Sequence, residues 1–207
     1  MKTLIYVLIL FVSLSTVAQS TDSFIQEAKS FQEELNLTYT NPDSTILSKK
    51  QLKKFKGLKF YPIDMKFRAS ATLKRTESEV PFKMELSSGL TREYVQYGLL
   101  NFVLEGTDFE IPIYQSTYYR DHPEVEYGNS LFLPFTDYTS GDGSYGGGRY
   151  IDFVLENIEE DRLIIDFNQA YNPYCAYATG YNCPIPPEAN DLKIRIEAGV
   201  KDFGGKY

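Results

Sequence analysis

The chain has 207 residues, which is enough for one domain with a substantial buried core. It carries 28 Asp and Glu against 21 Lys and Arg, and a surface with this net charge of −7 repels nucleic-acid phosphates. The composition therefore excludes nucleic acid as an expected partner and favours solubility.

The first residues have the pattern of a secretory signal peptide. Lys2 provides a positive start, residues 4–12 are apolar, and small residues precede a cleavage site after Ala18. Hydroxyl residues interrupt the apolar run, which is too short for a transmembrane helix of roughly 20 residues. We therefore expect a signal peptide over residues 1–18, one domain over residues 19–207, no membrane insertion after cleavage, and a periplasmic or extracellular location.

The apolar residues that follow the leader have helical spacing, which predicts a helix over residues 23–36. The apolar stripe consists of Phe24, Ala28, Phe31 and Leu35. Ser23 and Gln26 have the spacing of a capping box, so Ser23 is expected to cap the start of the helix.

A second, short helix is predicted over residues 47–55, where Ser48 and Gln51 repeat the capping-box spacing. This segment is rich in lysine, namely Lys49, Lys50, Lys53, Lys54, Lys56 and Lys59. Such a run usually forms the solvated face of a helix. A docking patch for an anionic partner is the alternative.

After Gly57 the helical spacing gives way to the alternation of apolar and polar residues that is typical of strands. Strands are predicted over residues 65–73, 80–86, 94–104, 109–115, 131–135, 150–155, 163–167 and 192–198. Residues 105–108 have the composition of a hairpin turn. Because the connections are short and hold no helix, the sheet must be mainly antiparallel. We therefore predict a mainly β fold, an antiparallel sandwich or a partly closed barrel, with one or two N-terminal helices.

A glycine-rich loop over residues 136–148 separates two of the predicted strands. Glycines permit a close approach of the backbone to a ligand, so the loop can line a binding site. It lacks the Lys-Ser/Thr pair of a phosphate-binding P-loop. Asp137 and Thr139 can equally well bond to their own turn, which would make the loop a wide hairpin. Both interpretations remain open.

Arg149 follows three glycines at the start of a predicted strand. The alternation places it on the same face as Ile151 and Phe153, which is the apolar face. A guanidinium on such a face must be paired, because an isolated buried charge costs several kcal/mol. We predict that its partner is a carboxylate such as Asp137 or Asp166, or the anionic group of a ligand.

The metal-ligating and nucleophilic residues are few. His122 is the only histidine, and its charged and proline-flanked setting predicts an exposed loop. Cys175 and Cys183 are too far apart for a zinc knuckle, and an even pair in an exported chain predicts a disulfide. Two buried thiols, or a metal-binding or catalytic cysteine, are the alternatives. We expect no metal site and no cofactor.

Two long stretches resemble domain-of-unknown-function family 1684. They are LFLPFTDYTSGDGSYGGGRYIDF, which begins at Leu131, and IDFNQAYNPYCAYATGYNCPIPP, which begins at Ile165. The similarity extends back to about Phe24, and the family has no established activity. It implies acidic residues where this chain has Ala189 and Val200. The Ala-Gln that follows the leader resembles exported proteins of Bacteroidetes-type bacteria.

The polar residues of two neighbouring segments are the candidate ligand-binding residues. They are Asp137, Thr139, Tyr145, Arg149, Asp152, Asn168, Tyr171 and Asn172. Our leading hypothesis is a small-molecule or glycan binding module of the cell envelope, with aromatic rings as contact area and Arg149 paired with an anionic group. One alternative is a hydrolase that uses carboxylates such as Asp137 and Asp152 as acid and base. The other is a structural or interaction domain without a small-molecule site.

Overall fold

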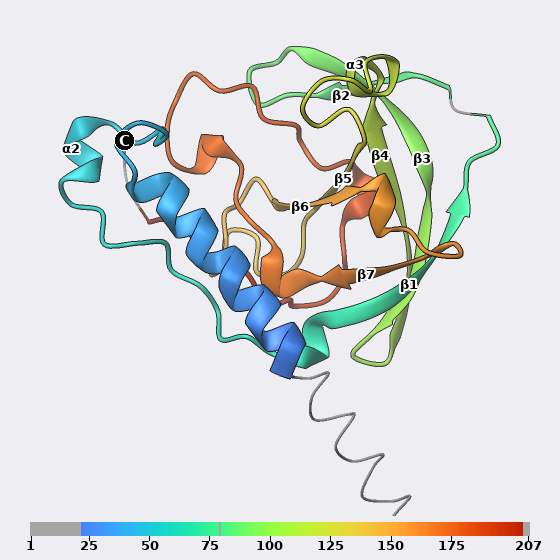
Figure 1. Ribbon diagram of the computed structural model, residues 1–207, viewed down its shortest axis with the longest axis horizontal. Helices are drawn as coiled ribbons and strands as arrows, with labels where there is room; N and C mark the ends of the chain where they lie inside the picture. The colour runs from blue at the N-terminus through green and yellow to red at the C-terminus, as the bar shows by residue number, and fades with distance from the viewer. Residues whose placement is uncertain (1–21, 79, 205–207) are drawn as a thin grey trace, which may run out of the picture.

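The protein forms a strongly curved antiparallel sheet with one long helix beside it (Figure 1). The computed structural model describes residues 22–78 and 80–204. The predicted signal peptide over residues 1–18 therefore lies outside the described residues. Within the described ranges, no helix is long and apolar enough to cross a membrane.

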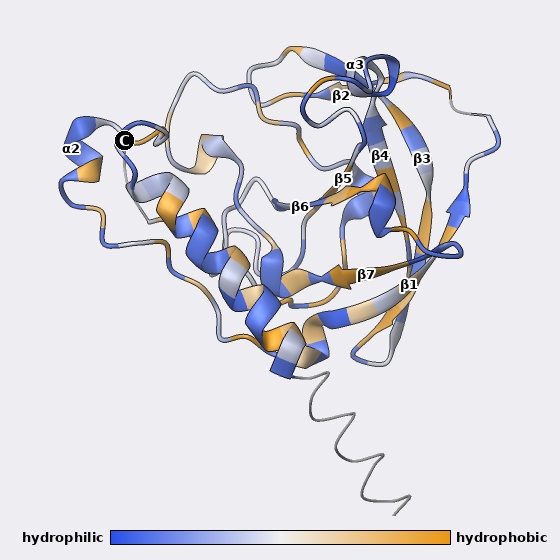
Figure 2. Ribbon diagram, in the orientation of Figure 1, coloured by the Kyte–Doolittle hydropathy of each residue, from blue (hydrophilic) through white to orange (hydrophobic). Residues whose placement is uncertain are grey.

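The first helix covers residues 22–40, so the helix predicted over residues 23–36 is confirmed and continues for about one further turn. Hydrophobic and hydrophilic residues alternate along it (Figure 2). The capping box predicted at Ser23 is wrong. Ser23 is itself helical, which excludes the extended backbone of an N-cap, and its hydroxyl bonds to Glu27 Oε1 at 3.4 Å.

Polar contacts attach this helix to the barrel. Gln32 Nε2 donates to the carbonyl of Asn168 at 3.1 Å. The guanidinium of Arg68 lies 3.9 Å from the centre of the Phe24 ring and 3.5 Å from the Glu27 carboxylate. The first and the middle turns of the helix are therefore both fixed against the sheet.

The second predicted helix exists but is short. Helix α2 covers Lys49–Leu52, and its N-cap Ser48 forms the predicted capping box with Gln51. Gln51 Oε1 accepts from Ser48 N at 2.9 Å, and Ser48 Oγ accepts from Gln51 N at 3.3 Å. The lysines of the segment are exposed, namely Lys49, Lys50, Lys53, Lys54, Lys56 and Lys59.

The sheet has seven strands. They are β1 (Arg68–Arg75), β2 (Phe82–Glu85), β3 (Thr91–Leu104), β4 (Thr107–Ser116), β5 (Ser130–Phe135), β6 (Arg149–Val154) and β7 (Arg162–Asp166). Their order is β6-β5-β4-β3-β1-β7, with β2 paired to β3, and every strand pairing is antiparallel. The remaining helical elements are α3 (Thr117–Asp121), η1 (Met65–Phe67), η2 (Leu155–Asn157), η3 (Phe167–Gln169), η4 (Tyr174–Ala176) and η5 (Glu188–Asn190). The predicted mainly β, antiparallel fold is confirmed.

The two ends of the sheet almost meet, so the fold is a nearly closed barrel. Strand β7 leads into η3, which carries the chain back towards β6. There Tyr150 N donates to Tyr171 O at 2.9 Å, and Tyr171 N donates to Tyr150 O at 3.0 Å. This single bridge joins the free edge of β6 to the segment after β7.

The hairpin predicted at residues 105–108 is confirmed. Strands β3 and β4 pair as far as Leu104 and Thr107, which leaves Glu105 and Gly106 as a two-residue turn. Both residues have positive φ, 49° and 76°, as the turn type that suits twisted strands requires. The turn sets the register of the two longest strands.

The barrel interior is apolar because alternate strand residues point into it. In β1 these residues are Ala69, Ala71 and Leu73, which are all buried, as the alternation predicted. The core continues through β3 to β7 and includes Phe135 and Phe167, whose rings meet edge to face with centroids 5.2 Å apart. Packing across the barrel therefore joins β5 to the segment after β7, the strand at the far edge of the sheet.

The strand predicted over residues 192–198 is wrong. Buried apolar side chains such as Ile196 and Ala198 gave this segment its strand-like alternation. Its first residues make isolated main-chain bonds with the glycine-rich loop, from Leu192 N to Thr136 O and from Tyr138 N to Ile194 O. Further along, its backbone groups bond to side chains. The carbonyls of Ile196 and Ala198 accept from the guanidinium of Arg149, and Ile196 N donates to Asp137. From residue 196 on, side chains occupy the positions that a neighbouring strand would need.

Cys175 and Cys183 form a disulfide, as predicted. The chain that leaves this loop runs along the end of β2, where Ser87 N donates to Cys183 O at 2.9 Å and Ile185 N donates to Glu85 O at 2.8 Å. The disulfide loop is thus anchored to the sheet on one side and cross-linked on the other.

We expect the double variant Cys175→Ser, Cys183→Ser to keep the fold and to unfold more easily. Closing a loop of this length stabilises a protein by about 2.5 kcal/mol in the chain-entropy description. Urea unfolding followed by far-ultraviolet circular dichroism would measure the loss, and the spectra before unfolding should coincide. An unchanged free energy of unfolding would contradict this expectation.

Candidate functional site

Arg149, at the start of β6, has a fully buried side chain. The alternation along β6 points it into the barrel with Ile151 and Phe153, as predicted. Its Nη2 donates to Asp137 Oδ1 at 3.1 Å, and neither side chain of this ion pair has exposed surface. The partner of the buried charge is therefore a carboxylate of the protein, and it is one of the two that were predicted.

The same guanidinium binds main-chain and hydroxyl oxygens. Nη2 donates to Ile196 O at 2.9 Å and to Thr139 Oγ1 at 3.2 Å, and Nη1 donates to Ala198 O. Burial lowers the pKa of Arg149, and the adjacent Asp137 carboxylate opposes that shift. We call Arg149 with Asp137, Thr139, Ile196 and Ala198 the Arg149 network.

The Asp137 carboxylate organises the glycine-rich loop. Its Oδ2 accepts from Thr139 N at 3.1 Å and from Ile196 N at 2.8 Å, and its Oδ1 accepts from Thr139 Oγ1 at 2.9 Å. Because the Thr139 hydroxyl donates to Asp137, the contact of 2.8 Å between Thr139 Oγ1 and Ser144 Oγ is donated by Ser144. These are the bonds that the hairpin interpretation of the loop predicts.

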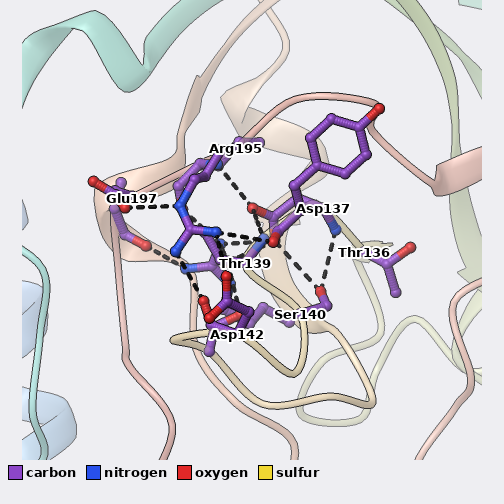
Figure 3. Close-up of polar contacts among 12 residues, drawn as sticks. Thr136, Asp137, Thr139, Ser140, Asp142, Arg195 and Glu197 are labelled. Atoms are coloured by element: carbon purple, nitrogen blue, oxygen red, sulfur yellow. Dashed lines mark hydrogen bonds and ion pairs between the residues drawn. The ribbon is translucent and has the colours of Figure 1, made fainter.

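A second, exposed layer of charges holds the outside of the same loop (Figure 3). Arg195 Nη1 donates to Asp142 Oδ2 at 2.8 Å, and Arg195 Nε donates to Glu197 Oε1 at 2.8 Å. The carbonyls of Tyr138 and Asp142 also accept from Arg195, at 3.2 and 2.9 Å. The loop is therefore tied to the segment after residue 192 both inside and outside the barrel.

Two glycines allow the main chain to approach the Arg149 network. Gly148 has a φ of 86°, and a Cβ there would lie 2.6 Å from the carbonyl oxygen of Phe135. Gly199 has a φ of 73°, and a Cβ there would lie 2.5 Å from the carbonyl oxygen of Ala170. Any other residue at either position would displace the backbone.

Asp152 lies on the opposite face of β6 from Arg149, and its side chain is exposed. Tyr171 Oη donates to Asp152 Oδ2. Desolvation by the surrounding protein raises the pKa of Asp152, and the hydrogen bond from Tyr171 opposes the rise. Asp137 and Asp152 are therefore separated by the strand, and Asp137 has no exposed surface. This geometry does not favour a hydrolase that uses these two carboxylates together.

The other three predicted binding residues lie apart. Asn168 bonds to the segment before β1, donating from Nδ2 to Asp64 O at 3.0 Å and accepting at Oδ1 from Asp64 N at 2.9 Å. Asn172 Nδ2 donates to Lys201 O at 3.0 Å. Tyr145 packs against a separate apolar cluster. The candidate residues thus form one buried network, one exposed pair and three separate positions.

His122 is exposed, as predicted, with its Nδ1 3.3 Å from the Glu124 carboxylate. Its ring lies 4.8 Å from that of Tyr118. Among the described residues, no group of His, Cys, Asp and Glu side chains could hold a metal ion.

A group of tyrosines that the sequence analysis did not single out gathers near the Asp152–Tyr171 pair. Helix α3 and the loop after it bring together Tyr118, Tyr119 and Tyr127, with ring centroids 5.5 Å apart for the first two and 6.2 Å apart for the last two. The disulfide loop contributes Tyr174 and Tyr181, with centroids 5.1 Å apart. We call these five residues the tyrosine face. The sequence signals for it were the count of 17 tyrosines and their density around residues 118–119 and 171–181.

Electrostatic contacts link the two halves of the tyrosine face. A hydrogen bond with Glu126 raises the pKa of Tyr127, and Tyr174 is close enough to add to the rise. Burial raises the pKa of Tyr171, and Tyr174 adds to this shift as well. Tyr174 is therefore close both to Tyr127 of the α3 loop and to Tyr171.

Tyr94 on β3 connects the same pair to α3. Burial raises the pKa of Tyr94, the guanidinium of Arg92 opposes the rise, and both Asp152 and Tyr119 add to it. The Asp152 carboxylate is thus within electrostatic reach of Tyr94 as well as of Tyr171.

Comparisons with known proteins identify relatives without a described activity. The model of a family described as "Protein of unknown function (DUF1684)" matches residues 53–201. The solution NMR structure of an uncharacterized protein from Haloarcula marismortui is similar, with a TM-score of 0.69 and 27% identity over 90% of this chain and 99% of that chain. No match was found among curated proteins.

We expect Arg149→Lys and Asp137→Asn to destabilise the protein strongly. A lysine ammonium cannot reach all four acceptors, and Asp137→Asn leaves the guanidinium buried without a counter-charge, a change that costs about 3–5 kcal/mol. Chemical denaturation of the purified variants would measure the loss. Arg195→Lys is the matched control, because its exposed ion pairs should contribute little. Equal losses of unfolding free energy in Arg149→Lys and Arg195→Lys would show that the buried network contributes no more to stability than the exposed ion pairs of Arg195.

Proposed function

The chain belongs to DUF1684, a family of proteins of unknown function, and we propose that it is an exported module that binds a glycan at the tyrosine face. The observation that carries the proposal is the gathering of exposed tyrosine rings on the α3 loop and the disulfide loop, close to the Asp152–Tyr171 pair. The descriptions of the family and of the similar structure name no ligand. The proposal is therefore supported by the contacts of this surface.

Exposed tyrosine rings suit the recognition of sugars. A ring offers a flat apolar surface to the C–H face of a sugar and a hydroxyl to its oxygens, with few rotatable bonds to immobilise. Tyr118, Tyr127 and Tyr174 are 58%, 59% and 47% exposed, although each could bury a large area. A cluster of such rings on a protein with a well-packed core supports an interaction surface.

The backbone at Tyr127 supports the same view. Tyr127 has a φ of 70°, a left-handed conformation that is costly for a residue with a bulky side chain. The turn is held by hydrogen bonds from Gly128 N to Val125 O and from Ser130 N to Tyr127 O, both 2.9 Å long. The surrounding structure thus keeps this ring exposed at the expense of local strain.

The Asp152–Tyr171 pair supplies the polar part of the proposed site. Tyr171 donates to Asp152 Oδ2, and Oδ1 accepts no hydrogen bond from the described residues. Oδ1 can therefore accept from a sugar hydroxyl, because an ionised carboxylate has several acceptor positions. A carboxylate beside aromatic rings orients a sugar that the rings hold.

We expect the double variant Tyr127→Ala, Tyr174→Ala to lose glycan binding without losing stability, because both rings are exposed. Native gels that contain laminarin, xylan or soluble starch would show binding as retarded migration of the unaltered protein. Tyr138→Ala is the matched control, since Tyr138 is 58% exposed and belongs to the glycine-rich loop instead of the tyrosine face. Retardation that is absent with every polysaccharide, or equal in all three proteins, contradicts the proposal.

Export rests on the leader-like N-terminus and on the disulfide, which persists in oxidising compartments. We expect the mature chain to begin at Gln19 when the full sequence is expressed in a Gram-negative host. Mass spectrometry of the periplasmic fraction would check this. Recovery of the intact chain from the cytoplasm alone, with its leader still attached, would overturn the assignment.

A further inference from the structure

A separate cavity of about 380 Å³ lies where α2 meets the C-terminal end of the described chain. Figure 1 shows that end of the chain next to α2. Three aromatic residues, Phe55, Tyr177 and Phe203, and four lysines, Lys54, Lys56, Lys59 and Lys201, contribute to its lining. We call this cavity the lysine pocket.

Three segments that are distant in sequence build the lysine pocket. Lys201 N donates to Lys59 O at 2.8 Å, and Phe60 and Val200 form an adjacent bridge. These bonds place the segment that carries Lys59 beside the segment that carries Lys201. Gln51 Nε2 donates to the carbonyl of Tyr177 at 2.8 Å, which fixes α2 against the disulfide loop. The pocket therefore depends on hydrogen bonds of the fold and not on one flexible loop.

Phe55 and Phe203, both partly exposed, form an apolar wall that packs against the buried ring of Tyr177. The ring of Phe203 lies 5.0 Å from that of Tyr177 and 6.3 Å from that of Phe55, measured between centroids. Tyr39 of the first helix supports Tyr177 from behind, with centroids 4.6 Å apart. Such a wall offers dispersion contacts to an apolar ligand body.

The lysines of the pocket lack carboxylate partners among residues 22–78 and 80–204. Lys66 and Lys193, by contrast, each form an ion pair with an aspartate. In the pocket, Lys201 Nζ lies 4.6 Å from the centre of the Tyr61 ring, a cation–π contact that leaves its charge unneutralised. Asp202 is the one acidic residue that lines the cavity. Four ammonium groups against one carboxylate concentrate positive charge on a chain whose net charge is −7.

We propose that the lysine pocket binds a small molecule that has an anionic group, carboxylate or phosphate, on a compact apolar body. The aromatic wall takes the body, and the lysines take the anionic group at the rim, where long side chains can reach without losing hydration. This site is independent of the tyrosine face. The lysine run of residues 49–59 offered an anionic partner as one interpretation, and the proposal identifies that partner as a small molecule.

The test compares three aromatic probes that share one body: 1-naphthaleneacetate, 1-naphthyl phosphate and the neutral 1-naphthaleneacetamide. Titration followed by amide NMR shifts should show the two anions, but not the amide, moving the signals of Gly57, Leu58 and Phe203. The stronger of the two anions identifies whether a carboxylate or a phosphate is preferred. Added salt should weaken both, because the lysines are solvated and their charge is screened.

Two triple variants separate the pocket from general surface charge. Lys54→Gln, Lys56→Gln, Lys59→Gln should weaken anion binding by about tenfold. The matched control Lys49→Gln, Lys50→Gln, Lys53→Gln removes the same charge from neighbouring positions that do not line the cavity, and should change affinity less than about twofold. Both variants should keep the melting temperature, because none of these lysines has a recorded ion pair in the described part of the chain.

Three outcomes overturn the proposal. They are equal affinity for the neutral amide, equal losses in the two triple variants, and an absence of shifts at the pocket with every probe. Because no residue of the tyrosine face is altered, polysaccharide retardation in both triple variants should match that of the unaltered protein. A failure of either site is therefore distinguishable from a failure of the other.

Discussion

A single guanidinium, that of Arg149, connects three parts of the chain inside the barrel. It stands on β6, its counter-charge Asp137 belongs to the glycine-rich loop, and its carbonyl acceptors belong to residues 196 and 198. A buried ion pair is not by itself a large source of stability, because desolvation offsets most of the attraction. Its effect is specificity: other arrangements of the loop or of the C-terminal segment would leave a charge buried without a partner. The arrangement of the glycine-rich loop and of the C-terminal segment at this end of the barrel depends on this constraint.

The sequence predicted the parts of the fold that depend on local pattern. Alternation located the seven strands and the inward side of Arg149, and a turn with glycine set the β3–β4 hairpin. The strand expected at residues 192–198 fails because burial produces the same alternation whether a backbone bonds to a neighbouring strand or to a side chain. The bonds that decide between these cases join residues 47 and 49 positions apart, and nothing local reports them.

The candidate site was predicted less well, for a related reason. Neighbouring polar residues on a strand face opposite ways, so Arg149 and Asp152 lie on different sides of β6 although they are close in sequence. Polar residues that are close together along the chain therefore lie apart in the structure. The tyrosine face and the lysine pocket show the converse: each gathers residues from segments that strand pairing and the disulfide loop bring together. Tyr174 and Tyr177 illustrate this, because three positions apart they belong to different sites.

The order of Arg149 and its acceptors along the chain constrains when the barrel can close. A ribosome makes β5, the glycine-rich loop and β6 before it makes residues 196 and 198, which carry the acceptors. Until then the guanidinium has only part of its set of acceptors and must stay hydrated, because a charge in an apolar interior needs them. The barrel therefore cannot seal around β6 until residue 198 has been made. All seven strands are synthesised before that point, so the sheet must wait for a segment that belongs to no strand before its interior can close.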